Sequence, residues 1–175
     1  MVNVIGLGYI GLPTALMLSS HGVEVIGTDY NKELVATLNE GKTTFKEDGL
    51  DELFQDALKS GIKFTTEYQV TDTYIVSVPT PYDKFSKKVD ACYVVAAVKD
   101  VMKVCPKGAT VVIESTVSPG TIEKFVRPVI EAYRKALQHR HPGEPWRRWR
   151  SSTGWAHRDS RADKLRGPKQ SCCHT

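Results

Sequence analysis

Short runs of β-branched and aliphatic residues alternate with segments of helical periodicity through the first 133 residues of this chain. Uninterrupted apolar runs are typical of strands that are buried on both faces of a parallel sheet. Apolar residues spaced three and four apart place one hydrophobic face on a helix. The pattern predicts strands at 2–5, 23–28, 62–65, 73–78 and 110–114, with a helix in most of the intervals between them.

The predicted helices follow Gly11, cover 31–40 and 50–58, follow Asp90, and begin near residue 122. Gly41 stands in the position expected of a C-terminal cap, and a second glycine at 61 ends the next helix. We expect Pro128 to kink the last helix, because proline removes a backbone hydrogen bond. Asp90 is expected to cap the helix that carries Val94, Val98, Val101, Met102 and Cys105 on one apolar face.

Strands that alternate with helices predict an α/β fold with a right-handed, doubly wound parallel sheet of the Rossmann type. We expect the spatial order 3-2-1-4-5. Pro79 and Pro81 cannot continue a central strand, so the chain must leave the sheet after the fourth strand. Ligands of such sheets bind at the carboxyl ends of the strands, here of strands 1, 2, 4 and 5.

A glycine-rich turn follows the first strand. Gly6, Gly8 and Gly11 have the G-x-G-x-x-G spacing, in which the glycines permit a tight turn, close approach of a pyrophosphate and close packing of the following helix. The free N–H groups and the dipole of that helix favour phosphate charge. The turn alone also occurs in proteins that bind no nucleotide.

Asp29 ends the second strand, 18 residues after Gly11. A carboxylate at this place accepts hydrogen bonds from the adenosine ribose of NAD and repels the 2′-phosphate of NADP. The alternative is that Asp29 caps the helix that starts at Asn31. The order of strand, glycine turn, helix, strand and acid favours NAD as the cofactor.

Composition divides the chain into two parts. Residues 1–133 carry 13 basic and 17 acidic side chains, whereas residues 134–175 carry 11 and 3. The second part contains all three tryptophans and no Val, Ile, Phe or Tyr, so it cannot supply a strand-rich core. We therefore expect a truncated Rossmann-like domain at 1–133 and a basic, disordered C-terminal tail at 134–175.

Apolar runs are too short to span a membrane, and the first strand begins at residue 2, which leaves no room for a signal peptide. We expect a cytoplasmic protein with no membrane partner. Four cysteines without a framework spacing predict reduced thiols, and Cys92 and Cys105 are interpreted as small buried hydrophobic residues.

Four segments in order carry a resemblance to a known family. They are Gly6-Leu7-Gly8-Tyr9-Ile10-Gly11-Leu12-Pro13, then Asp29, then Val78-Pro79-Thr80-Pro81, then Glu114-Ser115-Thr116-Val117-Ser118-Pro119-Gly120-Thr121. Together they resemble the nucleotide-sugar 6-dehydrogenases of the UDP-glucose/GDP-mannose dehydrogenase family. The resemblance covers residues 1 to about 133, which correspond to the NAD domain of that family.

The resemblance implies oxidation of the C6 alcohol of a nucleotide sugar to a carboxylate in two NAD-dependent steps, through a cysteine thiohemiacetal and thioester. Besides the three glycines, Tyr9, Ile10, Asp29, Thr80 and Thr116 are then expected to contact NAD. Thr116 would lie near the nicotinamide and the reacting carbon, in a supporting catalytic role. The alternative for Thr80 and Thr116 is local turn chemistry, since threonine beside proline or glycine satisfies backbone groups.

The family's Pro-Glu-Arg segment, dimerisation helix, catalytic lysine and asparagine, and cysteine in a Gly-Gly-x-Cys setting do not follow Tyr133. The resemblance implies a nucleotide-sugar partner and a homo-oligomer, but we expect this chain to be inactive alone. Cys172, Cys173 and His174 lack the scaffold of a nucleophile and the fourth ligand of a structural zinc site, so no metal is expected.

The tail has three interpretations: a natural basic extension, an out-of-frame translation product, or a nucleic-acid patch at 146–150. The abrupt change from lysine to arginine favours the second, and we expect no nucleic-acid partner. Two hypotheses for the whole chain remain. It is either the NAD-binding part of a dehydrogenase, or a non-enzymatic NAD-binding module with a basic docking tail.

Overall fold

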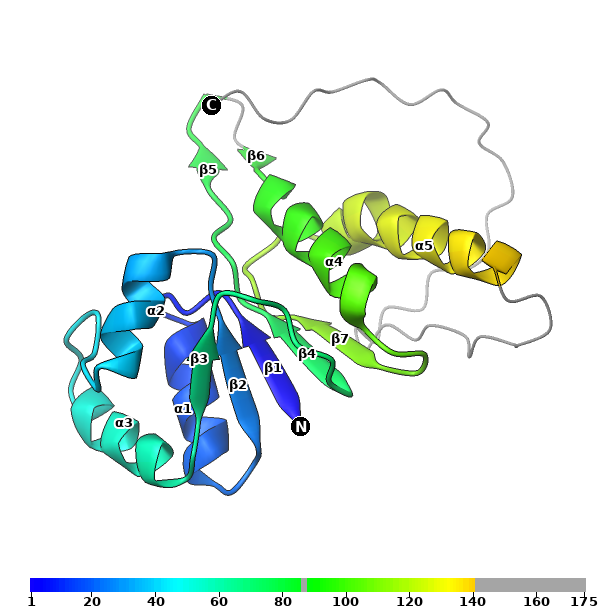
Figure 1. Ribbon diagram of the computed structural model, residues 1–175. Coiled ribbons are helices and arrows are strands. Elements are labelled where there is room, and N and C mark those ends of the chain that lie inside the picture. The colour runs from blue at the N-terminus through cyan, green and yellow to red at the C-terminus, as the bar shows by residue number, and fades with distance from the viewer. Residues whose placement is uncertain (86–87, 141–175) are drawn as a thin grey trace.

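The computed structural model describes residues 1–85 and 88–140. One parallel sheet has the strand order β3-β2-β1-β4-β7 (Figure 1). Its strands are β1 (Val2–Ile5), β2 (Val25–Thr28), β3 (Lys63–Thr65), β4 (Thr73–Val76) and β7 (Thr110–Ile113). Each lies within its predicted range, and the order confirms the predicted doubly wound sheet, with β7 as the fifth strand.

Helices cover the two faces of the sheet separately (Figure 1). One face carries α1 (Gly11–Ser20), α2 (Lys32–Asn39) and α3 (Leu50–Lys59), and the other carries α4 (Cys92–Val104) and α5 (Arg127–Arg140). Asn31 caps α2 with its side chain, and Gly41 and Gly61 follow the ends of α2 and α3 at φ near +80°. The predicted glycine stops are therefore confirmed.

The hydrophobic core has a part on each face. On the α1 side, Val4 of β1 packs with Leu12 and Leu16 of α1 and Phe54 of α3. On the α4 side, the buried residues include Ile5, Tyr74, Val76, Ala97 and Val101. Each large aliphatic side chain buried in this way contributes about 1.5–3 kcal/mol. The two parts hold β1 and β4 at the centre of the domain, and the candidate site is formed around the carboxyl ends of these strands.

Two features depart from the predicted elements. After Pro81 the chain forms a hairpin of β5 (Tyr82–Asp83) and β6 (Lys88–Val89), which are too short to produce a periodic pattern. The last helix begins as a π-helical segment, η1 (Ile122–Val126), which runs directly into α5. Pro128 has no N–H for the carbonyl four residues earlier, and the wider turn immediately precedes it. The predicted kink at Pro128 stays a prediction.

Helix α5 continues to Arg140, past the predicted boundary at 133/134. The helix therefore crosses the predicted boundary between the Rossmann-like domain and the tail, and the rest of the tail lies outside the described residues. Cys172, Cys173 and His174 lie outside the described residues, as does the tryptophan-rich segment at 146–150. The two-part division of the chain therefore stays a prediction. Among the described residues, no helix is long and apolar enough to cross a membrane.

Candidate functional site

The turn between β1 and α1 contains three glycines, of which Gly6 and Gly11 leave no room for a side chain. Gly6 has φ +89°, and a Cβ there would lie 2.8 Å from the Ser77 carbonyl oxygen. A Cβ on Gly11 would lie 1.8 Å from the Gly6 carbonyl oxygen. At Gly8, by contrast, no atom lies within 4 Å of the added Cβ. Two glycines therefore serve internal packing, whereas Gly8 faces open space that a ligand can approach.

Backbone donors line the same turn. The N–H groups of Gly8, Tyr9 and Ile10 make no hydrogen bond within the described part of the chain. Ile10, at the start of α1, supplies no side-chain cap, and the first turn of α1 contains no acidic residue. Unpaired N–H groups at a helix N-terminus favour an anion. The residues present therefore fit the pyrophosphate of a dinucleotide.

Asp29 lies beside this turn and is 9% exposed. Its Oδ2 accepts the Leu7 N–H at 2.8 Å, and its Oδ1 accepts the Asn31 N–H at 2.9 Å. The cap of α2 comes from Asn31, whose side chain accepts the N–H groups of residues 33 and 34. The alternative interpretation, in which Asp29 caps this helix, is therefore wrong, because the cap is Asn31. Each carboxylate oxygen has a further lone pair and can accept one more hydrogen bond.

The loops after β4 and β7 meet at the same edge of the sheet. The Thr80 hydroxyl donates to the Thr116 carbonyl oxygen at 2.8 Å, and the Ser115 hydroxyl donates to the Val78 carbonyl oxygen at 2.7 Å. The two threonines named from the family motifs are therefore brought together. The hydroxyl of Thr80 satisfies a backbone group of the facing loop rather than of its own turn, and Thr116 is exposed.

A hydrogen-bonded carboxylate connects these loops with α1. Glu114, directly after β7, accepts the Thr14 hydroxyl at 3.0 Å and also accepts the Ser77 hydroxyl. None of these three residues was assigned a role from the sequence, although Glu114 begins one of the four segments that carry the family resemblance. Their signal is weak: Ser77 follows β4 and Glu114 follows the partly exposed edge strand β7, and their pairing becomes visible only with the register of these two strands.

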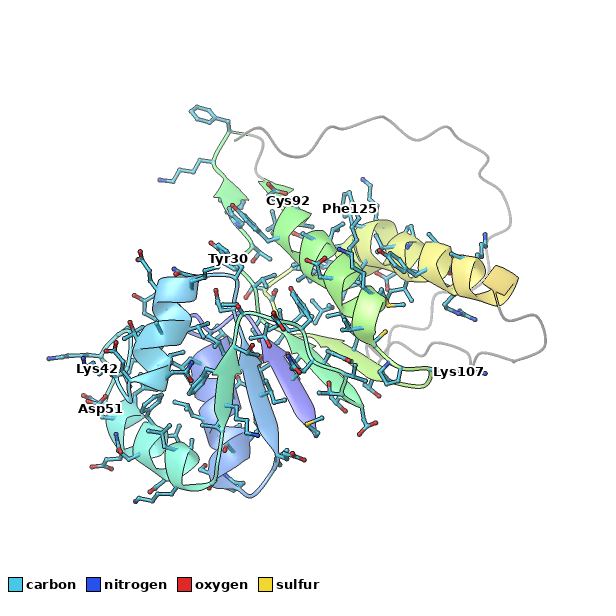
Figure 2. All side chains as sticks on the ribbon, in the orientation of Figure 1. Tyr30, Lys42, Asp51, Cys92, Lys107 and Phe125 are labelled. Atoms are coloured by element: carbon cyan, nitrogen blue, oxygen red, sulfur yellow. The ribbon has the colours of Figure 1, made fainter. Side chains whose placement is uncertain are left out.

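Phe45 and Tyr30 are aromatic residues near the glycine turn that were not singled out from the sequence, whereas Tyr9 was predicted to contact NAD. The Tyr9 ring is 71% exposed and contacts the Phe45 ring, with 4.5 Å between their centroids and an angle of 42° between their planes. Phe45 belongs to the connection between α2 and α3. Tyr30 follows Asp29, is 86% exposed, and lies near the beginning of α2 (Figure 2). The tip of the glycine turn is therefore held on one side by an aromatic contact.

The described cysteines carry free thiols. Burial raises the pKa of the Cys105 thiol, which favours the protonated form, and its Sγ contacts the Met102 sulfur at 3.8 Å. Cys92 lies at the start of α4, and its thiol donates to Asp90 at 3.2 Å (Figure 2). A nucleophilic cysteine needs an accessible thiolate. The environment of Cys105 does not favour one, and the thiol of Cys92 already has a carboxylate partner.

Comparisons with known proteins agree with this geometry. Residues 1–142 match the model of the UDP-glucose/GDP-mannose dehydrogenase family, NAD binding domain. The UDP-N-acetyl-D-mannosamine dehydrogenase of Methanococcus aeolicus is 45% identical over 127 residues, which are 71% of this chain and 29% of that protein. The NDP-N-acetyl-D-galactosaminuronic acid dehydrogenase of Ralstonia nicotianae is 41% identical over 125 residues, with 71% and 29% covered.

A solved structure gives the same result. The UDP-N-acetyl-mannosamine dehydrogenase from Staphylococcus aureus matches with a TM-score of 0.72 and 39% identity, over 75% of this chain and 32% of that one. The chain thus spans about a third of the length of the relatives that it matches. Both its sequence and its fold place it with the cofactor-binding part of these enzymes. The chain belongs to the UDP-glucose/GDP-mannose dehydrogenase family, and its residues 1–142 correspond to the NAD-binding domain of that family.

Proposed function

We propose that this domain binds NAD across the carboxyl ends of β1, β2, β4 and β7. The turn of Gly6, Gly8 and Gly11 holds the pyrophosphate, with Tyr9 and Ile10 at its tip. The observation that carries the proposal is the hydrogen bond from the Leu7 N–H to Asp29, because it fixes the carboxylate beside three unpaired N–H groups. Phosphate donors and a ribose acceptor are thereby adjacent.

We assign the two halves of the cofactor to the two halves of the sheet. Asp29 accepts hydrogen bonds from the adenosine ribose, and Thr80 and Thr116 lie on the nicotinamide side. The bond between these two threonines supports the second assignment, because it keeps their loops together. When bound, NAD supplies the hydride acceptor. The role of this domain is to bind and orient it, since orientation of the reacting carbons governs hydride transfer.

Isothermal titration of the 175-residue chain with NAD and with NADP tests the cofactor proposal. We expect NAD to bind more tightly, because the Asp29 carboxylate repels a 2′-phosphate. Equal affinities, or tighter binding of NADP, would contradict the assignment of Asp29. If neither cofactor binds, the proposed function fails as a whole.

The proposed substrate of the complete enzyme is UDP-N-acetyl-D-mannosamine, which such an enzyme would oxidise at C6 for the synthesis of surface polysaccharide. The relatives with this name include proteins that are 40–45% identical to the chain. A related N-acetylgalactosamine nucleotide is the competing substrate, because the Ralstonia relative is 41% identical. Formation of NADH with either nucleotide, by a full-length protein carrying this domain, distinguishes the two.

We propose further that the 175-residue chain alone binds NAD but does not oxidise the sugar. The family mechanism requires a cysteine in a Gly-Gly-x-Cys setting, and the printed sequence contains no such motif. Oxidation to a carboxylate needs this thiolate to trap the aldehyde stage. An NADH assay with the purified chain tests the proposal, with a full-length relative as the positive control.

Sustained turnover that stops when cysteines are alkylated would overturn the proposal and implicate a thiol of this chain. Turnover that survives alkylation would overturn it as well and would require another chemistry. NAD binding without turnover supports it. The hypothesis of a non-enzymatic NAD-binding module predicts the same binding, but also predicts that no protein containing this domain shows sugar-dependent NADH formation.

A further inference from the structure

Glu114 has more partners than the end of a strand requires. Its N–H donates to the Val76 carbonyl oxygen at 2.9 Å and so continues the pairing of β7 with β4. Its carboxylate then reaches two other elements, since it accepts hydroxyl groups from Thr14 on α1 and from Ser77 after β4. Thr14 lies 100 positions away in the sequence. One half-buried side chain thus connects three elements that surround the cofactor site.

The contacts of Ser77 extend this connection to the glycine turn. A Cβ on Gly11 would lie 3.0 Å from the Ser77 Cβ, and a Cβ on Gly6 would lie 2.8 Å from the Ser77 carbonyl oxygen. Both glycines therefore pack directly against this residue. Because Glu114 accepts the Ser77 hydroxyl, it joins the end of β7 to the residue against which both glycines pack.

The same carboxylate is the first of three side-chain links between the loops after β4 and β7. The others are the bond from Ser115 to Val78 and the bond from Thr80 to Thr116. Moving outward from the sheet, the links join residues 77 and 114, then 78 and 115, then 80 and 116. Of the three, the link through Glu114 alone also includes α1.

We propose that Glu114 is a positioning residue for the dinucleotide, an inference that rests on the proposed binding of NAD. Its carboxylate fixes the position of α1, whose N-terminus faces the pyrophosphate, relative to the loops that carry Thr80 and Thr116. The two ends of the cofactor are then bound at one fixed separation. A ligand that spans both ends depends on this register, whereas a ligand that occupies only the adenosine and phosphate end does not. Preorganisation of this kind affects affinity without a direct contact.

The test compares NAD with ADP on Glu114→Ala, by calorimetric titration of the whole chain. The variant leaves the Thr14 and Ser77 hydroxyls without their acceptor. We expect NAD to bind about 10-fold more weakly, and ADP to change by less than about 2-fold, since two charge-assisted hydrogen bonds are lost between elements that only NAD spans. Glu114→Gln keeps one acceptor oxygen and should recover part of the NAD affinity.

Tyr74→Phe is the matched control, because it also removes two hydrogen bonds from a buried group. The Tyr74 hydroxyl donates to the Gln69 carbonyl oxygen and accepts the Thr71 N–H, both at 2.9 Å, far from the glycine turn. We expect it to lower thermal stability without changing the ratio of NAD to ADP affinity. If Glu114→Ala does not fold, Thr14→Val removes the bond to α1 alone and provides the same comparison.

Equal losses of NAD and ADP affinity in the Glu114 or Thr14 variant would overturn the proposal, because they indicate general loosening of the fold. An unchanged NAD affinity would overturn it too. Failure of the wild-type chain to bind either ligand is a different result, since it refutes the proposed function rather than the role of Glu114.

Discussion

Replacing Asp29 with Asn tests how much of the cofactor site is also structural. The carboxylate accepts two backbone N–H groups, from Leu7 at 2.8 Å and from Asn31 at 2.9 Å. An amide has one acceptor oxygen, and its NH₂ group would face the other N–H. A hydrogen bond to a charged group contributes about 1.5–3 kcal/mol, so we expect the free energy of unfolding to fall by about 2 kcal/mol. For a chain of this length that is about 4–8 °C in melting temperature.

The same substitution removes the negative charge that discriminates against NADP. Its Coulomb interaction with a 2′-phosphate is on the order of 1–3 kcal/mol near a protein surface, or about 5- to 150-fold in relative affinity. Asp29→Asn should therefore weaken NAD and strengthen NADP, so that their ratio narrows by about this factor. Thermal unfolding and titrations with both cofactors at one ionic strength measure the two effects.

Asn31→Ala is the control for this experiment. It removes the cap of α2 but keeps the backbone N–H that Asp29 accepts. The expected loss of stability is about 1 kcal/mol, with no change in the ratio of NAD to NADP. If Asp29→Asn is as stable as the wild type, the two hydrogen bonds do not contribute as argued. If the cofactor ratio changes equally in both variants, the carboxylate is not the discriminating group.

Three further predictions follow from single side chains. Gly11→Ala should prevent stable folding, because its Cβ would lie 1.8 Å from the Gly6 carbonyl oxygen. Gly8→Ala should unfold at the wild-type urea concentration, because its Cβ meets no atom within 4 Å, but calorimetry should show a lower NAD affinity. Asn3→Val should raise the free energy of unfolding by about 1–2 kcal/mol, because both polar atoms of the buried Asn3 amide lack partners among the described residues; a lower urea midpoint would refute this. Burial raises the pKa of Tyr68 to about 12, so the folded chain keeps a proton that the unfolded chain loses above about pH 10. Stability should therefore fall between about pH 10 and 12, and Tyr68→Phe should remove that part of the pH dependence in unfolding curves.

The sheet could be predicted from the sequence because its signals are local. Each strand is an apolar run bounded by glycine, proline or polar residues, and the alternation with helices limits the topology to a doubly wound sheet. Gly41 and Gly61 marked the helix ends because glycine readily adopts positive φ. The spacing from Gly11 to Asp29 is also a local signal, because both residues belong to one β-α-β unit.

The remaining features depend on contacts between distant residues. The two strands of the hairpin after Pro81 have two residues each, too few for a period of two to appear. The bond between Thr14 and Glu114 joins positions that meet only because β4 lies between β1 and β7. The aromatic pair of Tyr9 and Phe45 depends on the path of the connection between α2 and α3. No local pattern encodes these contacts.

Asp29 and Glu114 lie on opposite sides of the glycine turn and have comparable roles. Asp29 ties the turn to the end of β2, and Glu114 ties α1 to the ends of β4 and β7. A substitution at either position therefore changes both the fold and the site, so a lower NAD affinity alone has two explanations. A ratio of two ligands measured on the same variant removes the shared contribution of stability, because both ligands bind the same folded population. The ratio of NAD to NADP then reports on charge at Asp29, and the ratio of NAD to ADP reports on the register that Glu114 maintains.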